Sequence, residues 1–398
     1  MSKVMTTLGE SCQFFNGKAH EKDIDAEGKY VVVNSKFISR DGKVRKYTGK
    51  QMFPLFEGDI VMVMSDVPNG KALAKCHIIE ENDRYSLNQR ICAIQTKEFD
   101  IRFLYYQLNR HPFLLAFNNG ENQSNLRKGD ILNCPLWKPS IEVQENIVAI
   151  LDKTFTSIDQ AKANIEKNIV NAKELFQSKL NYIFSQKGDG WEEKSIDEIS
   201  TVVNGYSFKS KDFSADNEVK SIKITNVGIM EFVEDSSNNL PTSFSQEYSK
   251  VQVHAGDLVL ALTRTIISGG LKVARVPESY HNSLLNQRVA AIVPNLDLVN
   301  SDYLYYYFSS DIVYDYVLSN VNTLMQPNLS IKDLKSMTIP VISIEGQRKI
   351  SIQIDDLSEK ANLLIGNYEV KLKNIEDLKK SILQKAFAGE LTENTVAV

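Results

Sequence analysis

The feature of this sequence that most constrains its fold is a long internal repeat. Gly-Asp-Ile-Val at 58–61 recurs as Gly-Asp-Leu-Val at 256–259, and Leu-Asn-Gln-Arg at 87–90 recurs at 285–288, both at an offset of 198 residues. Ile-Glu-x-Gln at 141–144 recurs at 344–347, at an offset of 203 residues. A period near 200 residues is far longer than a solenoid repeat. The chain is therefore predicted to contain two copies of a whole domain with its appendage.

Each copy combines a mixed part with a helical part. Segments 29–33, 59–63, 220–224 and 257–261 are typical of strands, with Gly, Asn and Asp in the gaps. From 144 to 184 and from 347 to 387, apolar residues recur at intervals of three and four without proline, which predicts two long helices with a coiled-coil seam. The seam residues are Ile147, Leu151, Ile158, Ala161, Ile165, Ala172 and Leu175 in the first helix and Ile350, Ile354, Leu357, Ala361, Leu364, Tyr368, Ile375 and Ile382 in the second.

These patterns predict an α+β fold: two pseudo-symmetric globular domains separated by a long antiparallel two-helix coiled coil. The expected segments are globular domains at 1–140 and 188–340, helical spacers at 141–187 and 341–391, and a tail at 392–398. Core helices of a bundle are the alternative interpretation of the two apolar stripes. Because a stripe of this length must be buried, we expect the two to pair, and antiparallel pairing would hold one domain at each end of a rod.

The overall composition is that of an ordinary globular protein, with 42% hydrophobic and 24% charged residues. No apolar run reaches the length of a membrane span and the N-terminus lacks a secretory pattern, so we expect a cytoplasmic protein without a membrane partner. The four cysteines lie in the first half without Cys-x-x-Cys spacing, which favours reduced core thiols. The five histidines are scattered, and no metal site is predicted.

The charge is distributed unevenly along the chain. The net charge is −4, which argues weakly against nucleic acid as a partner. Residues 1–140 carry 20 basic and 16 acidic residues, whereas residues 188–340 carry 12 and 19. The segment 36–50 suits phosphate contact and base-edge recognition, although a solvated hairpin is the alternative. Its six cations are the candidate DNA contacts of the first domain: Lys36, Arg40, Lys43, Arg45, Lys46 and Lys50.

In the second domain the candidate DNA contacts form local groups on an acidic body. Arg264 lies between two threonines after a predicted strand, and a loop arginine can contact guanine with two hydrogen bonds; an ordinary surface loop is nearly as well supported. The full set of candidates is Lys209, Lys211, Lys223, Asn226, Thr263, Arg264, Thr265 and Lys272. The Leu-Asn-Gln-Arg segments also contain base-reading residue types. Because two domains that read different sequences should differ where they touch bases, the identity of these segments favours a structural role.

Motifs typical of enzymes are missing from the sequence. It contains no phosphate-binding Gly-x-x-x-x-Gly-Lys-Ser/Thr loop, no Gly-x-Gly-x-x-Gly cradle and no Gly-x-Ser-x-Gly elbow. The Asn/Asp-Pro-Pro-aromatic segment of adenine methyltransferases is also absent. In a duplicated chain a catalytic motif should occur twice, so these absences together argue against catalysis, and no catalytic residue is assigned.

Taken together, these features resemble the specificity subunit of type I restriction–modification systems, over nearly the whole chain. The resemblance rests on the duplicated segments above and on Pro-x-x-Ser-Ile-Glu-x-Gln at 340–347, with the variant Pro-Ser-Ile-Glu-x-Gln at 139–144. It rests most strongly on Leu-Lys-Lys-Ser-Ile-Leu-Gln-Lys-Ala-Phe-Ala-Gly-Glu-Leu at 378–391, which looks like the family's helix end. In the first copy this ending has changed to Asn-Tyr-Ile-Phe-Ser at 181–185.

The resemblance implies a non-catalytic subunit that binds double-stranded DNA. It implies two target-recognition domains, each reading one half of a split site, and helices that set the spacer. It also implies two methylation subunits and restriction subunits as partners, which would bind S-adenosylmethionine, ATP and Mg²⁺, with no cofactor bound by this chain. A coiled-coil scaffold or adaptor that binds only protein partners is the alternative, and a stand-alone nuclease or methyltransferase is the least favoured.

Overall fold

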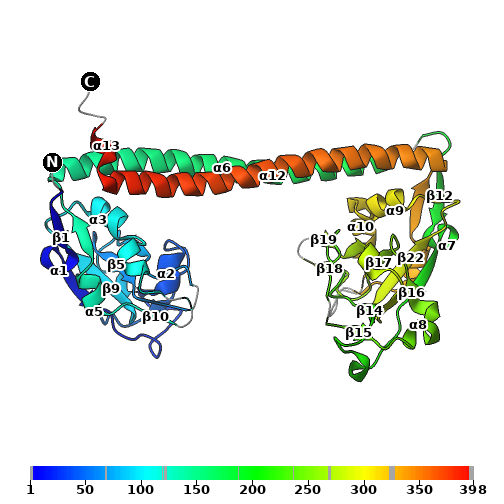
Figure 1. The fold of residues 1–398 in the computed structure, drawn as a ribbon, viewed down its shortest axis with the longest axis horizontal. Coiled ribbons are helices and arrows are strands. Elements are labelled where there is room, and N and C mark those ends of the chain that lie inside the picture. The colour runs from blue at the N-terminus through cyan, green and yellow to red at the C-terminus, as the bar shows by residue number, and fades with distance from the viewer. Residues whose placement is uncertain are drawn as a thin grey trace. The chain divides into compact units, whose positions relative to one another are not determined.

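The chain forms two compact units, each of which contains one globular domain and part of both long helices. The computed structural model describes residues 3–67, 70–118, 120, 123–186, 188–235, 237–267, 270–321 and 328–393. The first unit comprises residues 1–164 and 371–398, and the second comprises residues 165–370. Figure 1 shows the elements of each unit.

The first globular domain is built on a central four-stranded antiparallel sheet. Its order is β2-β9-β5-β7, formed by β2 (Gln13–Asn16), β9 (Ile91–Gln95), β5 (Ile60–Val63) and β7 (Cys76–Ile78). In a second sheet, β3 (Tyr30–Val33) pairs antiparallel with β4 (Tyr47–Thr48) and parallel with β8 (Tyr85–Leu87). The smaller elements are β1 (Met5–Thr7) paired with β11 (Pro135–Trp137), β6 (Ser65–Asp66) paired with β10 (Ser124–Asn125), α1 (Leu8–Ser11), α2 (Ser35–Ser39), α3 (Ile101–Leu108), α4 (Pro112–Leu115) and α5 (Lys128–Leu132).

The second globular domain repeats this topology. Its central sheet has the order β13-β22-β17-β20, with β13 (Ser200–Asn204), β22 (Val289–Pro294), β17 (Leu258–Ala261) and β20 (Val273–Arg275). The second sheet has the order β15-β14-β21-β16, with β15 (Asn239–Leu240), β14 (Val219–Ile222), β21 (Ser283–Leu285) and β16 (Gln252–Val253). The smaller elements are β12 (Glu192–Ser195) paired with β23 (Thr338–Val341), β18 (Ile266–Ile267) paired with β19 (Gly270–Leu271), α7 (Ile196–Ile199), α8 (Phe244–Glu247), α9 (Ser301–Phe308), α10 (Asp311–Asn320), α11 (Ile331–Ser336) and the 3₁₀ turns η1 (Ser210–Asp212), η2 (Ser249–Val251) and η3 (Glu278–Tyr280).

Both faces of each central sheet are buried, which explains the continuous apolar runs in the sequence. Side chains alternate along a strand, so Ile60 and Met62 of β5 pack toward α3, whereas Val61 and Val63 pack against the second sheet. In β17, Leu258 and Leu260 likewise join the core that includes α9, and Val259 joins the core on the opposite face. The predicted duplicated α+β fold is confirmed.

The two long helices are α6 (Ile141–Ser185) and α12 (Ile344–Ala388), each of 45 residues; α13 (Glu390–Glu393) follows the second. In the first unit the beginning of α6 packs against the end of α12, and Asp159 pairs with Lys379 at 3.0 Å. In the second unit Leu180 and Phe184 of α6 share a core with Ile354 of α12. The two helices are therefore antiparallel within each unit, as predicted (Figure 1).

The seam between these helices differs from the prediction at some positions. Ile147, Leu151, Ile158 and Ala172 are buried, but Leu175 is 58% exposed and Leu364 is 43% exposed. In the second unit the buried stripe of α6 continues through Phe176, Leu180 and Phe184 at spacings of four. Because an α-helix has 3.6 residues per turn, an i+4 stripe moves away from a heptad seam along the helix. The predictions that Leu175 and Leu364 lie in the seam were wrong for this reason.

Duplicated polar residues fasten the helices to the globular domains. The fully buried Gln144 side chain accepts a hydrogen bond from the Asp100 amide at 2.8 Å and donates one to the Pro139 carbonyl at 2.9 Å. Gln347, also fully buried, accepts from the Asn300 amide at 2.8 Å and donates to the Leu298 and Ile342 carbonyls at 3.1 and 2.7 Å. The repeated Ile-Glu-x-Gln segment is therefore an anchor for the start of each helix.

Cys76, Cys92 and Cys134 lie in the first domain's core and Cys12 is half-buried; all four are free thiols. Burial raises the pKa of the Cys92 thiol to about 12. Within the described ranges, no helix has the length and apolar character of a membrane span. The same residues include no cluster of three or more His, Cys, Asp or Glu side chains arranged to bind a metal ion.

Candidate nucleic-acid interface

The Leu-Asn-Gln-Arg turns, at 87–90 and 285–288, lie at corresponding ends of the two central sheets. We call this the turn end of each sheet, where β9 or β22 begins. In the first domain the Gly17 amide donates to the Ile91 carbonyl at 3.1 Å, and the Gln89 amide donates to the Lys18 carbonyl at 2.9 Å. In the second, the Gly205 amide donates to the Val289 carbonyl at 3.1 Å, and the Gln287 amide donates to the Tyr206 carbonyl at 2.8 Å. The same backbone hydrogen bonds therefore form in both domains. This supports the structural role that we expected for the Leu-Asn-Gln-Arg segments because they are identical in the two copies.

Glycine is required where the first strand of each central sheet approaches this turn. A Cβ atom added to Gly17 would lie 2.0 Å from the Asn88 carbonyl oxygen, and one added to Gly205 would lie 2.0 Å from that of Asn286. Neither oxygen can move freely, because both belong to the hydrogen-bonded turn. The matching Asn-Gly pairs at 16–17 and 204–205 are thus explained by close backbone approach.

The duplicated Gly-Asp segment lies at the opposite end of each central sheet. Gly58 and Gly256 have φ angles of 88° and 92°, in the left-handed region that favours glycine. The Asp59 carboxylate accepts a hydrogen bond from the Phe56 amide at 2.9 Å, and the Asp257 carboxylate accepts one from the His254 amide at 2.8 Å. Burial raises the pKa of both carboxyl groups. This motif therefore closes a loop before the central strand.

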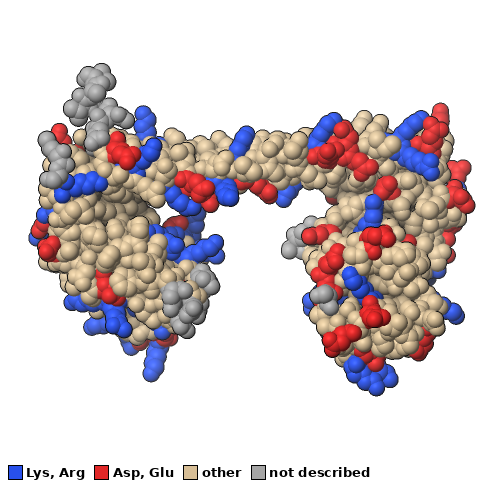
Figure 2. Space-filling view, viewed as in Figure 1, with Lys and Arg blue, Asp and Glu red and all other residues tan. Residues whose placement is uncertain are grey.

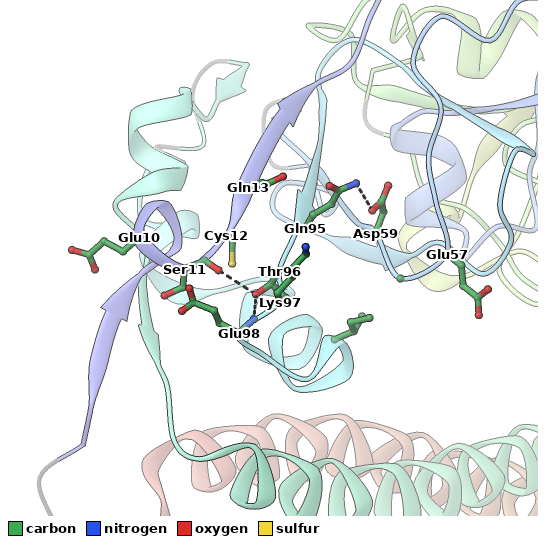
Figure 3. Close-up of a pocket in the computed structure, with 12 residues that line it drawn as sticks. Glu10, Ser11, Cys12, Gln13, Glu57, Asp59, Gln95, Thr96, Lys97 and Glu98 are labelled. Carbon is green, nitrogen blue, oxygen red and sulfur yellow. Dashed lines mark hydrogen bonds between the residues drawn. The ribbon is translucent and has the colours of Figure 1, made fainter.

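A pocket of about 440 Å³ next to Asp59 is lined by several acidic side chains, among them Glu10, Glu57 and Glu98 (Figure 3). Its polar groups take part in the fold, as the hydrogen bond from Gln95 to Asp59 at 2.8 Å shows in the close-up. Glu98 pairs with Lys138, and Glu10 accepts from the Thr7 amide at 2.9 Å. The negative lining is unsuited to a polyanion, so this end of the sheet is not the candidate interface.

The predicted basic segment of the first domain is a folded and exposed surface. Asn34 caps α2 by accepting from the Phe37 amide at 2.9 Å, and Phe37 and Ile38 anchor the segment in the core. Figure 2 shows blue prevailing over red on this domain, on the face in view. Lys50 pairs with Asp23 at 2.6 Å. The six predicted cations are all exposed: Lys36, Arg40, Lys43, Arg45, Lys46 and Lys50.

The candidates of the second domain separate into exposed and internal groups. Lys209, Lys211 and Arg264 are exposed, and Thr263 is half-buried. Asn226 is only 2% exposed, and its amide group accepts from the Lys223 amide and donates to the Val233 carbonyl, both at 2.8 Å. Asn226 therefore holds a loop closed and presents no free edge to a base.

The remaining three candidates are also packed within the domain. Thr265 is fully buried. The Lys223 ammonium donates to Asn238 at 2.5 Å and lies 3.6 Å from the centre of the Phe213 ring, and burial lowers its pKa. Lys272 donates to the Ile224 carbonyl at 2.7 Å. Burial lowers the pKa of Lys272, and the positive charge of Arg264 lowers it further. The effect of Arg264 on Lys272 indicates local positive potential, which suits an anion.

An aromatic cluster beside the second turn was missed in the sequence. Tyr206 is 46% exposed and its ring centre lies 4.6 Å from that of Tyr248. Phe208, Phe213 and Phe244 complete the cluster. These residues span 206–248, so only the tertiary fold brings them together, and no local pattern indicates it. An exposed ring of this kind can stack on a base or pack on a sugar.

Two copies of one α+β domain, each with exposed cationic side chains, are typical of a duplicated nucleic-acid-binding protein. The family model described as the type I restriction modification DNA specificity domain matches residues 2–170 and 188–374. These two matches cover most of the chain, which therefore belongs to the family of type I restriction–modification DNA specificity proteins. The alternative of a scaffold that binds only protein partners is not supported.

Curated relatives and solved structures agree with this family. The chain is 25% identical to the type I restriction enzyme MjaVIII specificity subunit of Methanocaldococcus jannaschii, over 96% of this chain and 92% of that one. It is 23% identical to the EcoBI specificity subunit of Escherichia coli, over 77% and 69%. Its fold is similar to a chain in a structure concerned with complex assembly and conformational transition of the type I R-M system (TM-score 0.74, 17% identity, 97% and 98% covered). It is also similar to the HsdS subunit from Thermoanaerobacter tengcongensis (TM-score 0.54, 18% identity, 97% of each chain covered).

Proposed function

We propose that this chain is the non-catalytic DNA-binding subunit of a type I restriction–modification complex and that it reads a bipartite site. Each globular domain contacts one half-site, and α6 and α12 set the spacer. One observation carries the proposal: the backbone framework around the turn end is the same in both domains, while exposed side chains on the segment that follows the close-packed glycine differ. Lys18 follows Gly17 in the first domain, and Tyr206 follows Gly205 in the second. A shared framework with different exposed groups suits two domains that read different sequences.

Within this function, the exposed and the internal candidates have different roles. The exposed cations of the 36–50 segment contact phosphates and position the first domain on its half-site. In the second domain Arg264, with Thr263 beside it, reads base edges, and Lys209 and Lys211 contact phosphates. Asn226, Thr265, Lys223 and Lys272 are packed inside the domain and serve its fold rather than contacting DNA. Direct base contacts by few groups suit a domain whose total charge is negative, because such a domain gains little from phosphate attraction.

The chemistry of the complex belongs to other subunits. Two methylation subunits bind S-adenosylmethionine and methylate adenine, and restriction subunits hydrolyse ATP with Mg²⁺ and cleave DNA. This chain binds no cofactor of its own and works in the cytoplasm, where the DNA is.

Long-read methylation mapping of the host tests the bipartite arrangement. The wild-type motif should consist of two short sequences separated by unspecified bases. Exchanging residues 1–140 for those of a relative should change one half only, while the other half and the spacer serve as internal controls. A contiguous motif, or a motif in which both halves change, contradicts the proposal.

The spacer is tested by lengthening both helices together. Seven residues inserted after Lys162 and another seven after Ile375, both at the 162–376 ion pair within the first unit, add about two turns to each helix. Two turns add about 10 Å, so the spacer should lengthen by about three base pairs. The control is the same insertion in α6 alone, which should break the pairing and reduce methylation. An unchanged spacer in the double insertion contradicts the role of the helices.

A further inference from the structure

We propose that Arg90 and Arg288 form a matched pair of sequence-independent contacts, in which each guanidinium binds a phosphate of the DNA backbone. The two residues occupy the last position of the Leu-Asn-Gln-Arg turns in the first and second domains. The inference rests on the proposed DNA-binding function and assigns to these turns a second role beside their structural one.

The structural role explains only part of the repeated segment. Leu87 and Leu285 are fully buried in the cores, and Asn286 is only 9% exposed. The Asn88 side chain accepts from the His20 amide at 3.2 Å. By contrast, Gln89, Arg90, Gln287 and Arg288 are exposed. Packing therefore accounts for the leucine and the asparagine of each turn but not for the exposed pair.

The backbone at the two arginines is one that arginine does not favour. Arg90 has a φ of 65° and Arg288 a φ of 70°, in the left-handed region where glycine, asparagine and aspartate are the usual residues. Another left-handed residue lies before the strand that leads into each turn, and there the chain uses Asp83 and Asn282, which tolerate it. A turn selected for its shape alone would use such a residue at 90 and 288 as well. Two arginines in unfavourable backbone geometry indicate that their side chains are needed.

The fold makes little use of these guanidinium groups. A backbone hydrogen bond and, to a smaller degree, the charge of Arg90 lower the pKa of the Glu21 carboxyl group. Among the described residues, no hydrogen bond or ion pair involves the side chain of Arg90 or Arg288. Arg110 provides the contrast, because it also has a positive φ, of 62°, but its Nη1 donates to the Lys71 and Leu73 carbonyls at 2.9 and 3.2 Å. The structure thus explains why residue 110 is an arginine and leaves the two turn arginines available for a ligand.

The residues around Arg90 and Arg288 differ between the two domains, and this difference indicates what the two arginines bind. The exposed residue that follows Gly17 or Gly205 is Lys18 in the first domain and Tyr206 in the second. Glu21 of the first domain corresponds to Lys209 of the second, 188 positions later. The Gln89 side chain donates to Glu21 at 2.7 Å, a contact that Lys209 cannot offer to Gln287. An available arginine is therefore the feature that both turns share. A partner common to two half-sites of different sequence is the phosphodiester backbone, which the planar arginine fork fits with two hydrogen bonds.

The test uses the full chain with Arg90→Gly, Arg288→Gly and the double variant. Glycine adopts a positive φ without steric cost, so the variants should fold, with thermal midpoints within about 2 °C of wild type. Binding is measured at several salt concentrations, to a duplex containing the mapped motif and to a duplex of scrambled sequence. Each variant should weaken binding to both duplexes by a similar factor, roughly three- to tenfold, and reduce the slope of log K against log salt by about one unit. The double variant should lose about two units.

Two controls define the result. Arg90→Lys and Arg288→Lys keep the charge and should retain most of the salt slope. Lys97→Gly removes an exposed positive charge two residues beyond the other end of β9 and should leave both affinities unchanged. Loss of affinity for the motif duplex alone would make the arginines base contacts and overturn the inference, as would unchanged binding to both duplexes. A wild-type chain that does not prefer the motif duplex contradicts the proposed function itself, which is a different outcome from a motif-selective chain that tolerates both glycine substitutions.

Discussion

The two globular domains share a backbone framework but differ in the side chains that pack inside it. In the first domain His20 is fully buried, and its ring nitrogens lie 2.7 Å from the Lys18 carbonyl and 2.8 Å from the Ser86 hydroxyl. In the second domain His20 corresponds to Phe208, 188 positions later, and Ser86 corresponds to Leu284, 198 positions later. Phe208 and Leu284 share an apolar cluster. A polar pair in one copy has therefore been exchanged for an apolar pair in the other.

The exchange shows which parts of the duplication are constrained. Both positions differ between the copies, which fits a coupled pair, because a histidine beside leucine would lose the hydrogen bond to the Ser86 hydroxyl. The backbone contacts of the Leu-Asn-Gln-Arg turn were kept, since they tie β2 or β13 to the strand that follows the turn. The duplication thus preserved main-chain geometry and allowed the side chains near the turn end to diverge, which is what recognition of two different half-sites requires.

The largest predicted effect tests whether the two frameworks are equivalent. Gly17→Ala and Gly205→Ala should each destabilise their own domain by about 3–4 kcal/mol, because each places a Cβ 2.0 Å from a carbonyl oxygen. Amide hydrogen exchange of β9 and β22 measures each domain separately. Gly49→Ala, which meets no atom within 4 Å, is the control and should change stability by less than about 0.5 kcal/mol. A large effect in only one domain would break the comparison.

The two glutamines that anchor the long helices, Gln144 and Gln347, are predicted to stabilise the fold by similar but unequal amounts. Gln347→Ala removes three hydrogen bonds from a buried side chain and Gln144→Ala removes two, so the costs should be about 3 and about 2 kcal/mol. Denaturation with urea, followed by hydrogen exchange at the start of α12 and α6, measures both. Equal losses would mean that the additional bond to the Leu298 carbonyl contributes nothing.

The exposed candidates should differ between domains in the kind of specificity they provide. Arg264→Ala should cost about 1–3 kcal/mol on a motif that contains guanine in the half-site of the second domain, and little on other sequences. Arg40→Ala in the first domain should weaken binding to all sequences alike, as expected of a phosphate contact. Titration of both variants against the mapped motif and its single-base changes separates the two. A uniform loss for Arg264→Ala would make it a phosphate contact.

The exchanged core pair can be tested by a double-mutant cycle. His20→Phe alone should destabilise the first domain by about 1–2 kcal/mol, because the Ser86 hydroxyl and the Lys18 carbonyl lose a partner. Adding Ser86→Leu should recover part of this loss, so that the coupling is favourable by at least about 0.5 kcal/mol. Additive effects in hydrogen-exchange stability would show that the two positions changed independently.

The smallest predicted effect is a dependence on pH in the first domain. Burial lowers the pKa of His77 and of His111, and the Nδ1 of His111 accepts from the Phe113 amide at 3.2 Å. The folded domain therefore favours the neutral rings, and the unfolded chain takes up protons first as pH falls through about 6.5. Stability should be complete above that pH and decrease below it. Thermal unfolding at pH 7.5 and 5.5 measures this, and His77→Gln with His111→Asn should flatten the change.

The sequence alone was sufficient for the architecture and for only part of the site. The duplication and the long helices were predictable because both leave patterns that extend over many residues. The exposure of the 36–50 cations followed from their density. The burial of Asn226 and Thr265 was not predictable, since it depends on loops that fold back onto the domain. The aromatic cluster around Tyr206 was missed for a related reason: its members are up to 42 positions apart, and no short window contains them.

The division of the helices between the units has a consequence for biosynthesis. Ala386 is fully buried in the core of the first unit, and the Phe387 ring lies 5.4 Å from that of Phe103. Residues 371–398 leave the ribosome after every residue of the second unit. The N-terminal domain must therefore wait, with apolar surface uncovered, while the later one already has all its residues. A stop codon before residue 371 would therefore remove part of the unit whose other residues are translated first.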